Sequence, residues 1–129
     1  MASKNPWEKI KHLASEIVPP VMVLREQATL LGEATGGVVQ GRVESDRNSR
    51  YLTHMLQAVV PTMNYYAVNL LEIRHEATLY PVFVIAPWKT MPQVKCDNVD
   101  NLATVVADLL SSGEVQNIVA SLLAQASQA

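Results

Sequence analysis

The chain has little cysteine, little charge and no long apolar run, and each shortage excludes a class of protein. Cys96 is the only cysteine among 129 residues, which excludes an internal disulfide and a cysteine-based zinc site. A lone thiol is typical of a reducing compartment, and the opening MASKNPWEK lacks the apolar core of a signal peptide. The apolar runs are far shorter than the roughly 20 residues of a membrane span. We therefore expect a cytoplasmic protein without membrane contact.

Charged residues make up only 17% of the chain, and the net charge is −2. Nucleic-acid binding depends on clustered lysine and arginine side chains, and the sequence has no such cluster. No basic residue follows Lys95, so the C-terminal segment carries acidic charges alone. The hydrophobic fraction of 49% is enough for one core, which predicts a single domain over residues 1–129 and no nucleic-acid partner.

Helical patterns occupy the N-terminal part of the chain. Residues 5–8, NPWE, are typical of a helix start, and apolar residues recur at helical spacing over residues 7–17. Two prolines at residues 19–20 interrupt this pattern, and a second helix runs from there to a glycine stop at residues 36–37.

The pattern then changes to the alternation of strands. We predict strands at residues 38–45, 50–60, 65–74 and 79–86, because these segments alternate or are rich in β-branched and aromatic residues. Short links favour antiparallel neighbours, so the four strands form a meander in chain order. Pro81 agrees with an edge position for the fourth strand.

An irregular connection over residues 87–98 precedes the C-terminal helices. Asp100 or Asn101 caps a third helix, and residues 111–113 separate it from a fourth. The predicted fold is therefore α+β, a four-stranded antiparallel β-meander flanked by two N-terminal and two C-terminal helices.

The charged residues within the apolar segment 70–88 are the first candidates for chemistry. His75 beside Arg74 and Glu76 has the residue types of acid–base catalysis. The same residues also suit the solvated tip of a β-hairpin, which is the interpretation we prefer, and no catalytic residue is predicted. Cys96 has only Lys95 nearby to activate it, so we expect a small buried residue.

A binding pocket between the sheet and the helices is the alternative. His54, Tyr66, Glu72 and Arg74 are its candidate lining residues, because all four lie on predicted strands. The three histidines have no HxH or HxxxH spacing, so no metal and no cofactor is predicted.

The apolar residues beyond one core predict association. Strands 50–60 and 65–74 carry apolar side chains on both faces, and the last helix has an uncharged polar face. If all helices gather on one side of the sheet, the other side needs another chain. We expect a non-enzymatic protein–protein interaction module, such as an accessory, regulatory or chaperone-like subunit, that pairs with itself as a homodimer or with another protein. The alternative is a small-ligand-binding domain or enzyme.

Overall fold

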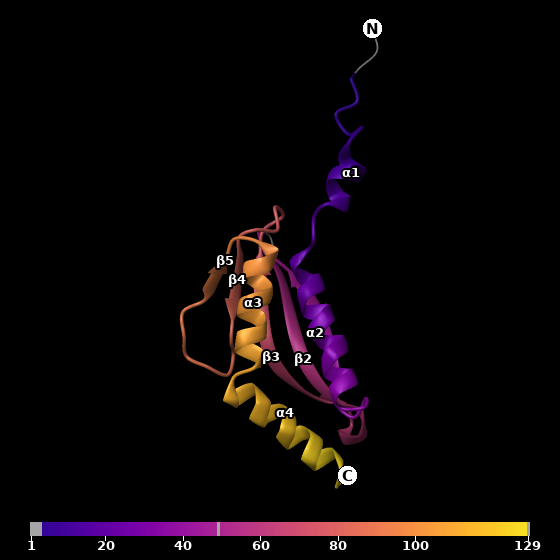
Figure 1. Cartoon of the computed structure of the whole chain (residues 1–129), viewed down its shortest axis with the longest axis vertical. Helices are drawn as coiled ribbons and strands as arrows, with labels where there is room; N and C mark the ends of the chain where they lie inside the picture. The colour runs from indigo at the N-terminus through magenta and orange to yellow at the C-terminus, as the bar shows by residue number, and fades with distance from the viewer. Residues whose placement is uncertain (1–3, 49, 129) are drawn as a thin grey trace.

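A computed structural model describes residues 4–48 and 50–128. The elements in chain order are α1 (Ile10–Ser15), α2 (Pro20–Ala34), β1 (Gln40–Arg47), β2 (Leu52–Val60), the 3-10 helix η1 (Pro61–Met63), β3 (Tyr66–His75), β4 (Val82–Ile85), β5 (Val94–Cys96), α3 (Val99–Leu110) and α4 (Gly113–Ala126). An antiparallel sheet with helices packed on it confirms the predicted α+β class (Figure 1). Within the described ranges, no helix is long and apolar enough to cross a membrane.

Among the described residues the sheet has five strands in the order β1-β2-β3-β4-β5, one strand more than predicted. The additional strand, β5, lies in the segment expected to be irregular and pairs with β4, where Cys96 faces Val82. Three residues are too few to display alternation in the sequence, so β5 is recognised as a strand only by its pairing with β4. β4 is therefore an inner strand rather than an edge, and Pro81 precedes it instead of lying within it.

The helices are placed differently from the predicted two plus two around the sheet. α2 packs on β1 and β2, α3 packs across β3, β4 and β5, and α4 reaches β2. All three lie on the same side of the sheet, which we call the covered face; the opposite side is the open face (Figure 1). α1 extends beyond the start of α2 and has no buried residue, so the α-helices that contribute to the core in the described part of the chain are α2, α3 and α4.

The helix ends follow local chemistry. Gly36 and Gly37 have φ angles of 62° and 82°, and the N–H of Gly37 donates to the carbonyl of Gly32 at 2.8 Å, which confirms the predicted glycine stop. Asn98, rather than either predicted residue, caps α3, because its Oδ1 accepts the Asn101 N–H at 2.8 Å.

A β-bulge in β3 determines which side chains reach the covered face. The pair Gln57–Asn69 is followed by the pair Leu56–Leu71, so Leu70 has no partner on β2. An inserted residue reverses the alternation of the strand beyond it. Leu70 and Leu71 are consequently both buried, although they are neighbours in a strand.

The bulge corrects the expectation of two apolar faces for β3, whereas β2 keeps Met55 and Val59 on the open face. The apolar residues of β3 on either side of the bulge share the covered face, and the open face is largely polar. There, Arg42 Nη2 donates to Gln57 Oε1 at 2.9 Å, and Gln57 Nε2 donates to Asn69 Oδ1 at 2.8 Å. An antiparallel sheet can leave such a face in water. The open face therefore does not by itself require a second chain.

α2 approaches β1 closely at Gly41. A Cβ at this position would overlap the backbone of Ala28, whereas a Cβ at Gly32, within α2, would meet open space. The glycine in β1 thus allows a contact that any larger residue would prevent.

We predict opposite effects for alanine at these two glycines. Gly41→Ala forces α2 away from β1 and should lower the free energy of unfolding by roughly 1–3 kcal/mol. Gly32→Ala should raise it by about 0.5–1 kcal/mol, because alanine suits a helix interior better than glycine. Urea denaturation measures both, and an unchanged midpoint for Gly41→Ala would contradict the packing of α2 on β1.

Trp88 holds the bulge in place. β4 ends at Ile85 opposite Glu72, so Leu70 lies beyond the end of that strand. The indole N–H of Trp88 donates to the Leu70 carbonyl at 2.6 Å, in place of a ladder partner. A buried carbonyl without a partner costs free energy, so the indole stabilises the distorted strand.

Replacing Trp88 by phenylalanine should keep most of the packing and remove this donor. We expect Trp88→Phe to lower the free energy of unfolding by roughly 1–3 kcal/mol in urea denaturation. Tyr65→Phe, at a side chain that is 66% exposed, serves as the control and should change it by less than about 0.5 kcal/mol. Equal midpoints for the two variants would show that the indole does not support the bulge.

Candidate functional site

The four residues predicted to line a pocket do not meet. His54 is 8% exposed and lies on the covered face of β2. Glu72 and Arg74 lie on the open face, where Arg74 Nη2 and Glu72 Oε2 form an ion pair at 3.1 Å. Tyr66 is 54% exposed at the opposite end of β3. The structure brings only Glu72 and Arg74 together.

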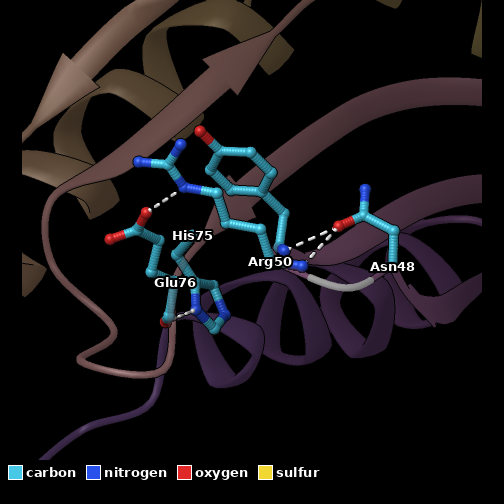
Figure 2. A network of polar contacts seen from close by, with 5 residues as sticks. Asn48, Arg50, His75 and Glu76 are labelled. Atoms are coloured by element: carbon cyan, nitrogen blue, oxygen red, sulfur yellow. Dashed lines mark hydrogen bonds and ion pairs between the residues drawn. The ribbon is translucent and has the colours of Figure 1, made fainter.

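The other charged residues around the β3–β4 turn also have separate surroundings (Figure 2). Glu76 is exposed just after β3, and Arg50 Nε donates to Glu76 Oε1 at 2.7 Å. Asn48 Oδ1 accepts the backbone N–H groups of Arg50 at 2.9 Å and Tyr51 at 2.8 Å. His75, in contrast, is only 2% exposed. The hairpin-tip interpretation is right for Glu76 and wrong for His75.

His75 and His54 form a buried pair across β2 and β3. Their Nε2 atoms are 3.1 Å apart, and the ring centroids are separated by 5.1 Å. Ser45 Oγ lies 2.6 Å from His54 Nδ1, and the carbonyl oxygen of Glu76 lies 2.7 Å from His75 Nδ1. All four imidazole nitrogens therefore have a partner within the protein.

The last acceptor in this chain of hydrogen bonds fixes both tautomers. The Glu76 carbonyl can only accept, so His75 Nδ1 carries a proton and its Nε2, in the neutral ring, accepts. His54 Nε2 must then donate to it, which leaves His54 Nδ1 to accept from the Ser45 hydroxyl. The pair is complete when both rings are neutral.

Burial favours the neutral state of His54. It lowers the pKa of His54 below its ordinary value of 6.5, and the neighbouring His75 and Arg25 add smaller effects in the same direction. A general base must reach its substrate, and these nitrogens reach only each other and two protein oxygens. The pair is thus a structural contact in the core, and no spacing of the histidines along the chain indicated it.

The remaining candidates for chemistry are isolated. Cys96 is buried as expected, and burial raises the pKa of its thiol, which disfavours the reactive thiolate. Across residues 4–48 and 50–128, no three histidine, cysteine, aspartate or glutamate side chains gather closely enough to hold a metal ion.

A cleft of about 250 Å³ lies between α2 and α4. Its apolar lining comes from both helices and from the bulged part of the sheet, through Leu30, Leu31, Leu56, Leu70, Val115 and Val119. Gln27 and Gln116 add amide groups. A cleft between sheet and helices is therefore present, but it contains none of the four predicted lining residues.

Apolar side chains are also exposed on the N-terminal arm, by which we mean residues 5–19. Trp7 is 68% exposed, and Ile10, Leu13 and Ile17 are each about half exposed. At the base of the arm, the Tyr80 hydroxyl donates to the carbonyl of Val18 at 3.0 Å. The helical spacing of these residues gathers them on one side of the arm, and they are exposed to solvent within residues 4–48 and 50–128.

Comparison with known proteins adds no relative. No family model, no curated protein and no solved structure matches the chain. The geometry of the arm, the cleft and the histidine pair is therefore the basis for judging function.

The lowered pKa of His54 predicts how stability depends on pH. Because the pKa of His54 is lower in the folded protein than in the unfolded chain, the unfolded chain binds more protons as pH falls below about 6.5. The free energy of unfolding should be constant just above that pH and decline through the native pKa, by up to about 1.4 kcal/mol per pH unit.

Urea denaturation between about pH 7.5 and pH 5.5 tests this decline, since carboxylates titrate mainly below that range. His54→Gln should flatten the dependence. His12→Gln, at an exposed histidine of the arm, is the matched control and should leave the slope as in the wild type. A slope that persists in His54→Gln would exclude this histidine as its source.

Proposed function

We infer that this chain is a non-enzymatic protein–protein interaction module that pairs with a second copy of itself. The observation that carries the inference is the uncovered apolar side of the arm. An apolar stripe on a helix is stabilising only when it is buried, and nothing in the described part of the chain buries this one. A partner surface would provide the missing cover.

The position of the other functional candidates supports a role without catalysis. The histidine pair is sealed inside the core, and Glu72 and Arg74 neutralise each other on the open face. We propose an accessory, regulatory or chaperone-like subunit. Cytoplasmic location is part of the proposal and is supported by the single buried thiol, which suits a reducing compartment.

Binding of a small apolar ligand is the second candidate function, and the α2–α4 cleft is the observation that favours it. Its size and apolar lining suit a compact apolar molecule, with Gln27 and Gln116 as hydrogen-bonding groups. The cleft leaves the exposed arm unexplained, whereas pairing through the arm requires an apolar seat of this kind. Self-association therefore accounts for both features.

Light scattering on purified protein tests the pairing. We expect the wild type to approach twice 14.2 kDa as its concentration rises. Ile10→Ser with Leu13→Ser should remain near 14.2 kDa, because both changes remove apolar area from the arm. The matched control, Glu8→Ser with His12→Ser, alters the polar side of the same segment and should still pair.

A wild-type mass of 14.2 kDa at every soluble concentration would contradict self-association. Dissociation of the control to the same extent as the apolar variant would show that helix content, rather than apolar contact, governs pairing. Circular dichroism on all three proteins provides the comparison of helix content.

A further inference from the structure

We propose that the arm of one copy docks in the α2–α4 cleft of a second copy, with Trp7 entering the cleft. The proposal rests on the proposed function and adds the site at which the arm binds. Two apolar features of one chain, the exposed side of the arm and the lining of the cleft, then bury each other.

The size of the cleft suits an aromatic ring. Its volume of about 250 Å³ exceeds the roughly 150 Å³ of an apolar cavity that accommodates benzene. The leucine and valine lining can enclose the indole carbons, and the two glutamine amides offer acceptors for the indole N–H. Tryptophan is also one of the residues enriched at the energetic centre of protein interfaces.

The charges of the two surfaces are complementary. The arm and the residue before it carry three lysines, Lys4, Lys9 and Lys11, against two glutamates. The helices α2, α3 and α4 carry one basic residue, Arg25, and five acidic residues: Glu26, Glu33, Asp100, Asp108 and Glu114. Glu114 directly precedes the cleft residue Val115, and Glu33 lies within the turn of α2 that contains Leu30 and Ala34. Opposite net charges favour encounter of the arm with this side of a second copy.

The position of the arm favours exchange over folding back. The arm leaves from the N-terminal end of α2, whereas the cleft lies beside the C-terminal half of that helix, and the arm points away from it (Figure 1). Two copies related by a twofold axis can each place an arm in the other's cleft. Each contact then occurs twice, which brings the buried area toward the roughly 1,200–2,000 Å² of a stable interface.

Disulfide cross-linking between two chains that carry different engineered cysteines tests where the arm binds. Both chains carry Cys96→Ala, so that only engineered thiols are present. One chain carries Trp7→Cys and the other Leu30→Cys, at a lining residue that is 47% exposed and therefore tolerant of change. We expect a disulfide between the two chains under mild oxidation. The matched control replaces Leu30→Cys by Gln57→Cys on the open face and should give little product.

The affinity of pairing provides a second readout. Trp7→Ala should weaken dimerisation about tenfold or more, as expected for a buried interface tryptophan. Glu8→Gln, on the polar side of the arm, should leave the dissociation constant within about twofold. Leu30→Gln, at the cleft, should weaken pairing to an extent similar to that of Trp7→Ala.

Three results would overturn the proposal. A dimer that cross-links through Gln57→Cys instead of Leu30→Cys would place the arm on the open face and leave self-association intact. A disulfide that forms only when Trp7→Cys and Leu30→Cys share one chain would show that the arm folds back on its own cleft. A monomer at every concentration, without cross-linking, would remove the proposed function as well.

Discussion

The inserted residue at Leu70 determines which side chains meet on each side of the sheet. Continuing the register that pairs Ala58 with Val68 would place Glu72 and Arg74 on the covered face beside His54. The bulge reverses β3 instead, so that Leu71, Ile73 and His75 enter the core. The Glu72 carboxylate and the Arg74 guanidinium would otherwise be buried under α3, where desolvation costs several kcal/mol per ion. The histidine pair, the polar open face and the single apolar core all follow from this one insertion.

The sequence was sufficient for the elements with strong local signals and insufficient where tertiary pairing decides. The glycine stop of α2 and the order of β1 to β4 could be predicted from turn chemistry and periodicity. β5 could not be predicted, because a strand of three residues is too short to show a period. The bulge could not be predicted either, because Leu70 and Leu71 are both apolar and either one fits the covered face. An unbroken register places His54, Tyr66, Glu72 and Arg74 on one face, so that candidate site depended on an alternation that β3 does not keep. The same error concealed His75 as the partner of His54.

Because the bulge places the apolar residues of β3 on the covered face, a partner surface is expected on another part of the chain than the sheet. The open face carries hydrogen-bonded polar side chains such as Arg42 and Gln57, with Met55, Phe83 and Ile85 between them. Exposed apolar side chains are most closely grouped along the arm, and the bulge contributes Leu70 to the lining of the cleft in which we propose that the arm binds. The acidic character of α2, α3 and α4 then gives the lysine-bearing arm an electrostatic preference for that side. Fold and proposed function thus depend on the same irregularity in β3.

Cross-strand nuclear Overhauser effects between β2 and β3 test this dependence most directly. The Leu70 bulge predicts backbone contacts of Gln57 with Asn69 and of Leu56 with Leu71, and side-chain contacts between the rings of His54 and His75. Contacts of Leu56 with Leu70 and of Met55 with Leu71 would instead show an uninterrupted register. In that case Glu72 and Arg74 would lie on the covered face, and the division into a polar open face and one apolar core would be wrong.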